Sequence, residues 1–302
     1  MGLKIGLIIY SVREMSYRTL GRTNLHVSEL SLGGGPFGGL YEWGVGVFSD
    51  DSCINYLDTA PHYGLGRSEK FLGKVCSIKG FYISTKVGHY DNFFDFSAKS
   101  VFGLHHIRND PSFIENERKK NKLRFIGASA YPVSILKDLC EISDQIDVIL
   151  SYSRDTLLTA TLENYLPFFK VCCTGMGLLS TVGPQTWHPA TDHLKEICHK
   201  AADNVELGKL AVYFCLQKII LSSSCLVGMG STKILKLNLD ATFNNISDKE
   251  KTSFKSYKQS WGTATAKKIE WNDSSNEMFT YAVVAFLKRR GSEKKRIFLR
   301  RL

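Results

Sequence analysis

Several features are missing from this sequence, and each absence excludes a class of protein. None of its 302 residues lie in a run of the roughly 18 apolar residues that a membrane-spanning helix needs; the nearest runs are Gly6–Tyr10 and Met278–Leu287. The eight cysteines form no C-x-x-C pair, which argues against structural zinc and a thioredoxin-type site. Only seven residues are proline, and 43% are hydrophobic, which excludes collagen-like and disordered chains. We therefore expect a soluble cytoplasmic protein with reduced thiols and no metal site.

Positive charge is concentrated at the end of the chain. The formal net charge is +10 at pH 7. The last fifteen residues, Lys288–Leu302, hold eight lysines and arginines against Glu293, a net +7 that leaves about +3 for everything before them. We expect no nucleic-acid or membrane partner for the near-neutral body. Only the basic tail has the composition to bind RNA or anionic lipid.

Short apolar runs alternate with helical patterns along most of the chain. The runs are His26–Leu32, Ile54–Leu57, Phe81–Thr85, Leu123–Ile126, Asp147–Leu150 and Cys225–Val227. The helical patterns are Ser68–Val75, Pro132–Ile142, Leu157–Phe169, Asp192–Asn204, Leu207–Ile219 and Thr232–Phe243. Such alternation predicts parallel βα units, and the chain is long enough for a closed barrel of about 250 residues.

Polar side chains follow these runs at the point where each one ends. Asp58 follows the second run, Lys86 the third, Ser129 the fourth and Ser151 the fifth. In a βα barrel the carboxyl ends of the strands form the face that holds the active site. We therefore expect Asp58, Lys86 and Ser129 to converge although they are far apart in sequence.

One segment carries a family resemblance. Asp58–Gly73 reads DTAPHYGLGRSEKFLG, which resembles the D-T-A-x-x-Y-G-x-G-x-S-E-x-x-L-G signature of the aldo-keto reductases. Further matches to that family are Tyr17–Thr23, Ser84–Lys86 and Arg124–Ser129. The branch of L-galactose dehydrogenases and D-arabinose 1-dehydrogenases is the most similar, through Asp95–Lys99, Asp147–Tyr152, Gly183–Ala190 and Leu226–Met229. The resemblance implies an α/β fold, a (β/α)8 TIM barrel of aldo-keto reductase type. It also implies an NAD(P)-dependent oxidoreductase acting on an aldose or another small carbonyl substrate.

The resemblance also implies a catalytic set of Asp58, Tyr63, Lys86 and His106, and elementary chemistry supports these residue types. Hydride transfer between a nicotinamide and a carbonyl needs a group that exchanges a proton with the substrate oxygen, the role of Tyr63. A free phenol has a pKa near 10, and a nearby ammonium such as Lys86 lowers that pKa. Asp58 would pair with Lys86 and hold it. His106, with His105 as the alternative, would donate to the substrate oxygen.

Cofactor contacts follow from the same resemblance. A predicted helix begins directly after Gly228, Met229, Gly230 and Ser231. The backbone N–H groups of this segment and the Ser231 side chain could hold a phosphate at the positive end of that helix. Asn238 matches the asparagine that the family uses around the adenine, and Ser129 matches a carboxamide contact. The other residues assigned to the cofactor site are Ser151 and, in the first-strand loop under the nicotinamide, Gly34 and Gly35.

The choice of nicotinamide cofactor depends on one position. The family's usual NADP-selecting arginine is replaced here by Ile234. The loss of that charge favours NAD, whereas Lys233 and Lys236 could compensate and permit NADP.

Four pieces of the expected barrel are short or missing. They are the first helix, between Phe48 and Ile54; the third helix with the fourth strand, between Phe96 and His105; the segment from Ile107 to Lys122; and the seventh strand, between Lys170 and Gly175. A parallel crossover needs at least about 10–12 residues. The sequence therefore predicts an incomplete barrel with two open strand edges and an uncovered apolar face.

This pattern divides the chain into an N-terminal extension (residues 1–16), the reductase barrel (17–260) and an unmatched basic tail (261–302). The gaps leave open a second interpretation, a catalytically impaired relative that binds the cofactor and has a regulatory role, or an incomplete gene model. As an enzyme, the chain would act on a small-molecule aldose or carbonyl as a monomer or weak oligomer.

Overall fold

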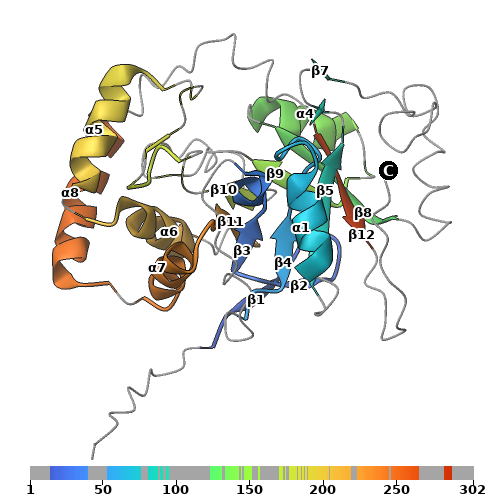
Figure 1. Cartoon of the computed structure of the whole chain (residues 1–302), viewed down its shortest axis with the longest axis horizontal. Coiled ribbons are helices and arrows are strands. Elements are labelled where there is room, and N and C mark those ends of the chain that lie inside the picture. The colour runs from blue at the N-terminus through green and yellow to red at the C-terminus, as the bar shows by residue number, and fades with distance from the viewer. Residues whose placement is uncertain are drawn as a thin grey trace, which may run out of the picture.

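The centre of the structure is a closed barrel of strands (Figure 1). The computed structural model describes residues 14–39, 53–75, 81–87, 89–90, 93–94, 123–130, 133–142, 144, 146–151, 156, 170–172, 174, 177–181, 183–184, 186, 188, 190–203, 205–218, 223–244, 246–264 and 282–287. Around the barrel the strands are β3 (Leu30–Gly33), β4 (Tyr56–Asp58), β5 (Tyr82–Val87), β12 (Ala282–Leu287), β8 (Leu123–Ala130), β9 (Val148–Ser151), β10 (Lys170–Cys172) and β11 (Cys225–Gly228). The predicted α/β barrel is confirmed.

Seven of these strands, all but β12, run parallel to one another and follow chain order around the barrel, and β11 closes onto β3. Their apolar sequences fit this position, because a parallel strand is covered on both faces. Every residue of β4 and of β9 is buried. The predicted strand His26–Leu32 is divided at Glu29. Its first part, β2 (His26–Ser28), pairs with β1 (Tyr17–Thr19) as an antiparallel hairpin, and its second part is β3.

The place of the fourth barrel strand is taken by β12, which comes from the segment 261–302 that the sequence analysis set apart as a tail. β12 lies between β5 and β8 and runs antiparallel to both. Its register pairs Val283–Phe286 with Ser84–Val87 on one side and Ala282–Leu287 with Leu123–Ser129 on the other. The two open edges expected from the sequence are therefore covered, because an antiparallel strand satisfies the same backbone N–H and C=O groups.

The other predicted gaps have different outcomes. The seventh strand is shortened to the three residues of β10. The segments 49–52 and 95–122, which include the regions of the first helix, the third helix and His106, lie outside the described residues, as do the predicted helix 157–169 and the basic tail 288–302. A two-stranded hairpin of β6 (His89–Tyr90) and β7 (Phe93–Phe94) follows β5.

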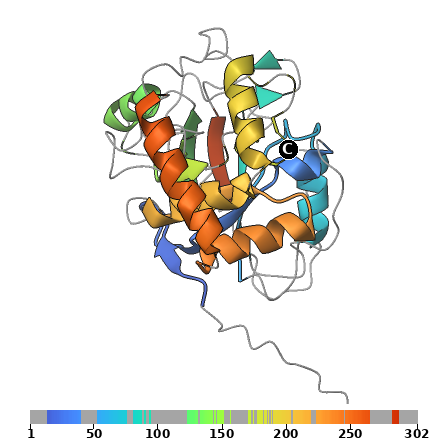
Figure 2. The same cartoon turned by 90° about the vertical axis from the view of Figure 1, so that its left-hand side faces the viewer.

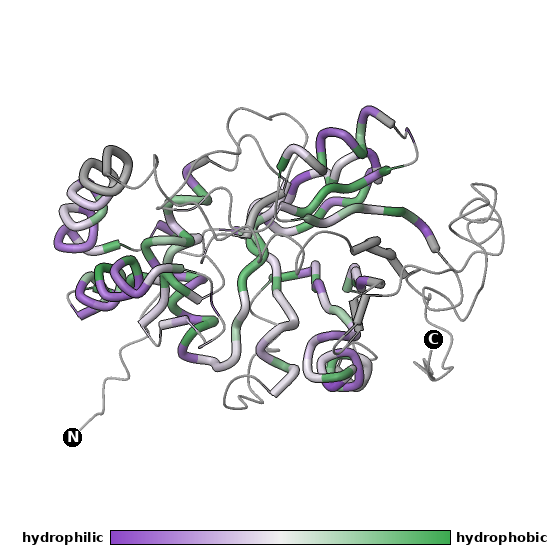
Figure 3. Tube along the Cα trace, turned by 90° about the horizontal axis from the view of Figure 1, so that it is seen from above, coloured by the Kyte–Doolittle hydropathy of each residue, from purple (hydrophilic) through white to green (hydrophobic). Residues whose placement is uncertain are grey.

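Helices cover the barrel on two sides. α1 (Arg67–Val75) follows β4 and α4 (Val133–Ile142) follows β8. The other side is covered by α5 (Asp192–Ala202), α6 (Leu207–Lys218), α7 (Thr232–Thr242) and α8 (Asp248–Ala264), which lie in front of the strands in Figure 2, coloured from yellow to orange-red. Figure 3 shows hydrophilic residues along these peripheral helices and mainly hydrophobic or neutral residues along the central strands. No helix among the described residues is long and apolar enough to cross a membrane.

Two clusters of buried side chains fill the interior. The larger packs the helices against the barrel, with Leu136 of α4 and Leu207, Leu210, Ala211 and Val212 of α6 fully enclosed. The smaller contains Leu20, Leu25, Val27, Tyr56, Val148, Leu150 and Leu226. It joins the β1–β2 hairpin to the barrel strands β4, β9 and β11.

Candidate active site

Three of the four predicted catalytic side chains meet at the carboxyl ends of β4 and β5. Asp58 is the last residue of β4, and Lys86 is the fifth of the six residues of β5. Tyr63 lies in the loop between β4 and α1. Asp58 pairs in register with Ser84, two residues before Lys86. Because side chains alternate along a strand, Ser84 and Lys86 point to the same face.

Among the described residues, three oxygen atoms accept hydrogen bonds from the Lys86 ammonium. Its Nζ donates to Asp58 Oδ1 in a buried ion pair, to the Thr59 carbonyl at 3.2 Å and to Tyr63 Oη at 3.3 Å. Three acceptors match the three N–H groups of an ammonium. Lys86 is only 5% exposed and Asp58 only 3%. A buried pair of this kind is costly to break, about 3–5 kcal/mol, because the remaining charge has no partner.

Tyr63 is therefore placed with a cation directly at its phenol oxygen. Lys86 Nζ also lies 5.0 Å from the centre of the Tyr63 ring. The oxygen that accepts from Lys86 keeps its own hydrogen for another acceptor, and the adjacent positive charge favours the phenolate form. This is the arrangement needed by a tyrosine that gives and takes a proton.

The loop that carries Tyr63 depends on a glycine. Gly64 has φ +60°, and a Cβ atom there would lie 1.7 Å from the Gly38 carbonyl oxygen. Gly38 belongs to the short 3-10 helix η1 (Gly35–Gly38), which follows β3. The backbone of Gly64 thus touches η1 directly, which fixes the position of the neighbouring Tyr63.

Hydrogen bonds fix the base of the same loop. Ser68 Oγ donates to the Gly34 carbonyl at 2.7 Å and lies 2.8 Å from Thr59 Oγ1, and the Gly34 N–H donates to the Asp58 carbonyl at 2.6 Å. A Cβ atom at Gly34 would lie 2.7 Å from Ser68 Oγ, so this glycine has a packing reason of its own. At Gly35 an added Cβ meets no described atom within 4 Å, so the room there is open.

The predicted cofactor residues lie at the ends of neighbouring strands and on the helix that follows β11. Gly228 pairs with Gly33 across β11 and β3, and Met229 and Gly230 lead to Ser231, whose Oγ caps α7 by accepting from the Ile234 N–H at 3.3 Å. Ser129 and Ser151 are buried on β8 and β9 in adjacent register positions, since Ser129 pairs with Leu150 and Ala130 with Ser151.

Two of these residues have a buried polar atom without a hydrogen-bond partner among the described residues: Oγ of Ser151 and Nδ2 of Asn238. Asn238 lies on α7, two turns after its N-terminus, and is 3% exposed. A buried polar group without a partner is unfavourable by about 1–3 kcal/mol. Such atoms fit a site that is completed by a polar ligand.

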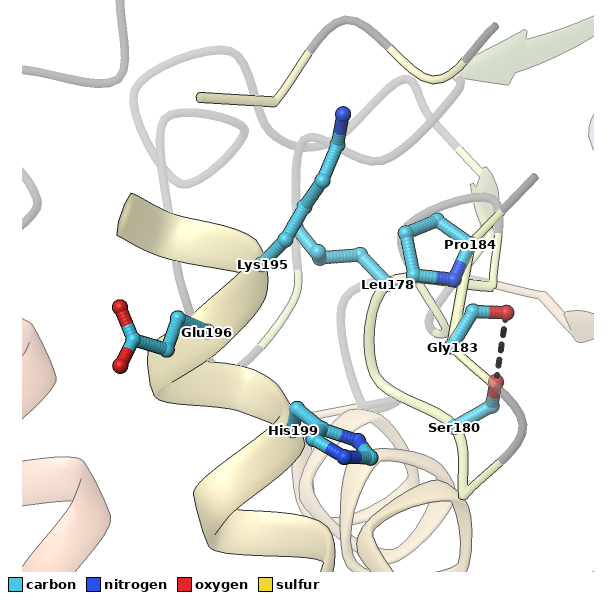
Figure 4. A pocket seen from close by; sticks show the side chains of 7 residues that line it. All are labelled: Leu178, Ser180, Gly183, Pro184, Lys195, Glu196 and His199. Atoms are coloured by element: carbon cyan, nitrogen blue, oxygen red, sulfur yellow. Dashed lines mark hydrogen bonds between the residues drawn. The ribbon is translucent and has the colours of Figure 1, made fainter. Parts of the chain in front are cut away.

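A surface hollow of about 280 Å³ lies apart from these residues, between the loop at Leu178–Pro184 and α5 (Figure 4). Its lining residues are Leu178, Ser180, Gly183, Pro184, Lys195, Glu196 and His199. None of them belongs to the predicted site. In Figure 4 the Glu196 carboxylate points away from the hollow. Ser180 Oγ donates to the Gly177 carbonyl at 2.7 Å and lies 3.5 Å from the Gly183 carbonyl, the contact that is dashed in the figure.

The structure thus brings Asp58, Tyr63 and Lys86 together, whereas His106 lies outside the described residues. Two further contacts, from Ser84 Oγ to Asp58 and from Lys86 to the Thr59 carbonyl, were not predicted. A signal for Ser84 was available, because a residue two positions before Lys86 on a strand shares its face. Among the described residues no group of three His, Cys, Asp or Glu could hold a metal ion.

Comparison with known proteins finds similar dehydrogenases and a similar reductase structure. No protein-family model matches the chain. The L-galactose dehydrogenase of Arabidopsis thaliana is 30% identical over 285 residues, which cover 76% of this chain and 88% of the plant protein. The D-arabinose 1-dehydrogenase of Saccharomyces cerevisiae is 27% identical over 241 residues, covering 62% of this chain and 72% of the yeast protein. An aldo-keto reductase from Bacillus halodurans, solved in its holo form, superposes with a TM-score of 0.56 at 19% identity and covers 81% of this chain and 96% of its own.

Proposed function

The chain belongs to the aldo-keto reductase family, and on that premise we propose that this NAD(P)-dependent oxidoreductase oxidises an aldose at C1 to a lactone, with NAD as its cofactor. L-galactose and D-arabinose are the first substrates to test, because the relatives at 30% and 27% identity are named for them. The observation that carries the proposal is the contact of Lys86 Nζ with Tyr63 Oη while Asp58 holds the same ammonium.

The proposed chemistry starts from Tyr63. In the oxidative direction the sugar loses a proton from its C1 hydroxyl and a hydride from C1. The phenolate oxygen of Tyr63 takes the proton, and the Lys86 charge stabilises that phenolate beforehand. A bound nicotinamide supplies the acceptor for the hydride. His106 is proposed to orient the substrate oxygen, and in the reductive direction Tyr63 returns the proton to the carbonyl.

The residues present fit a nicotinamide cofactor. The partnerless Ser151 Oγ and Asn238 Nδ2 are suited to a ligand that offers hydrogen-bonding atoms along the barrel mouth and α7. With them we propose Ser129, Gly34, Gly35 and the backbone N–H groups of Gly228, Met229, Gly230 and Ser231 as the groups that would hold it.

NAD is proposed over NADP because of the first turn of α7. Ile234 is 37% exposed there and brings no charge for a ribose phosphate. Lys233 lies 3.9 Å from Glu206, which offsets its charge. Lys236, which is also exposed, is the other cation in the first two turns of α7.

The proposal is tested by following reduced-nicotinamide absorbance while the purified protein is mixed with NAD or NADP and a panel of aldoses. Tyr63→Phe is the control, because it removes the proton-exchanging oxygen and keeps the ring. General acid–base catalysis contributes about 10²–10⁴-fold, so Tyr63→Phe should lower kcat by a factor in that range. A folded protein that binds NAD without turning over any sugar would reject the dehydrogenase proposal and favour a cofactor-binding relative without catalysis.

A further inference from the structure

Asp58 is held from its second oxygen by a chain of two buried hydroxyl groups. Ser84 Oγ donates to Asp58 Oδ2 at 2.6 Å, and the hydroxyl of Tyr56 lies 2.8 Å from Ser84 Oγ. Ser84 is fully enclosed and Tyr56 is 1% exposed. The two carboxylate oxygens of Asp58 thus have separate tasks: Oδ1 binds the Lys86 ammonium, and Oδ2 binds Ser84.

The number of protons on each group decides which hydroxyl donates in each of these hydrogen bonds. A carboxylate paired with an ammonium accepts hydrogen bonds only, and a serine hydroxyl has one proton to give. That proton goes to Asp58, because the alternative acceptor, the Leu57 carbonyl, is 3.5 Å away. Tyr56 must then donate to Ser84. Burial, followed by the nearby Asp58 charge, raises the pKa of Tyr56, which keeps it protonated and able to donate.

The register of β4 and β5 brings these hydrogen-bonded side chains together. Tyr56 and Asp58 are two residues apart on β4, and Ser84 and Lys86 are two residues apart on β5, so each pair shares a face. Asp58 lies directly opposite Ser84. No loop is involved, so the two strands alone set the positions of the four residues.

We propose that Tyr56 and Ser84 are positioning residues that fix the Asp58 carboxylate, so that Asp58 holds Lys86 against Tyr63. The proposal rests on the proposed function of Tyr63. With only Oδ1 bound, the carboxylate could rotate about its Cβ–Cγ bond, and Lys86 would follow either oxygen. Anchoring Oδ2 removes that freedom and leaves the ammonium in one place beneath the phenol oxygen.

The kinetic test uses Ser84→Ala, Tyr56→Phe and the double variant. Ser84→Ala should lower kcat about tenfold, because a hydrogen bond to a charged group is lost, with KM changed by less than about twofold. Tyr56→Phe should lower kcat less. In the Ser84→Ala background Tyr56→Phe should have no further effect, because Tyr56 acts through Ser84. Additive losses in the double variant would overturn the proposal.

Matched variants separate positioning from loss of stability. Ser31 on β3 also has a buried hydroxyl, hydrogen-bonded to Ser224 Oγ and the Ser28 carbonyl. Ser31→Ala should lower the thermal midpoint without lowering kcat. Tyr82 lies opposite Tyr56 in register, and Tyr82→Phe should leave kcat unchanged. If Ser31→Ala lowers kcat as much as Ser84→Ala, positioning is rejected.

A second readout needs no turnover. The ultraviolet signal of tyrosinate formation at Tyr63 is isolated by subtracting the pH titration of a matching Tyr63→Phe variant. In the Ser84→Ala background this signal should develop about one pH unit higher, corresponding to the tenfold effect. The described titratable groups around Lys86, namely Asp58, Tyr56, Tyr63 and Glu69, are all retained in that background. An unchanged titration overturns the positioning proposal even if no sugar is oxidised, whereas absence of turnover alone rejects only the proposed function.

Discussion

Lys86 of β5 lies opposite Val284 of β12, so the strand that carries the buried ammonium is completed by residues near the end of the chain. On its other side Val284 pairs with Gly127 of β8. Without β12, both β5 and β8 would present unpaired backbone groups along their length, and an open edge is unfavourable and prone to association. The strand that carries Lys86 therefore has its outer edge paired by a segment that the sequence analysis had placed outside the barrel.

Substitution of Ala285 by proline tests the role of β12. Ala285 pairs with Thr85 and with Ile126, and proline would remove its N–H from the ladder. Hydrogen exchange should become faster at the amides of both β5 and β8, and the thermal midpoint should fall. Ala285→Gly, which keeps the N–H, is the control. If β5 remains equally protected in Ala285→Pro, the pairing does not exist in solution.

Two glycines of the loop between β4 and α1, which carries Tyr63, offer a matched pair of substitutions. Gly64 and Gly66 both have positive φ, +60° and +79°, but a Cβ meets Gly38 at 1.7 Å in the first case and no described atom within 4 Å in the second. Gly66→Ala should cost about 1–2 kcal/mol of stability, from backbone strain alone. Gly64→Ala should cost more and also lower kcat, because the loop with Tyr63 must move. Thermal unfolding and sugar turnover would be measured on both variants; equal effects would contradict the close contact with η1.

How far the sequence predicts this site can be judged from particular residues. Asp58 and Lys86 could be placed together because each ends an apolar run, and parallel strands bring such ends to one face. Tyr63 required the family signature, since no periodicity distinguishes it from a half-buried aromatic residue. Ser84 required only the alternation of side chains along β5.

The position of Ala282–Leu287 could not be predicted in the same way. Its apolar pattern indicates a strand or a short buried helix, but local sequence does not encode which edges it will pair with. Its place depends on the unfilled space between β5 and β8, a property of the whole barrel. The gap itself was visible in the sequence, whereas the segment that fills it lies more than 150 residues away from β8.

The first turn of α7 provides a test of cofactor choice. Ile234→Arg places a cation where the exposed isoleucine side chain now lies, and leaves the backbone N–H that Ser231 caps. The dissociation constant for NADP should fall about tenfold, or roughly 1.4 kcal/mol, whereas that for NAD should change little. Titration of reduced-cofactor fluorescence measures both. Equal tightening of NAD and NADP would show that the added charge does not reach the ribose phosphate.

Glu69 gives a pH-dependent prediction. It lies on α1 and accepts from Thr85 Oγ1 at 2.6 Å. Burial raises the pKa of Glu69, against the opposing effects of that hydrogen bond and of the Lys86 charge. The folded protein therefore binds the Glu69 proton more tightly than the unfolded chain does. The favourable contribution is fully present below the unfolded pKa and is lost as the pH rises through the raised folded pKa.

Glu69→Gln lacks this titration and should gain stability relative to the wild-type chain as the pH rises from about 4 to about 8. Denaturant midpoints of both proteins across that range measure the difference. Glu196 is the control of opposite sign, because the hydrogen bond from Lys200 lowers its pKa. Glu196→Gln should therefore lose a little stability relative to wild type as the pH rises, an effect limited by its exposure. A Glu69→Gln difference that stays constant with pH would mean that the carboxyl of Glu69 is solvated as it is in the unfolded chain.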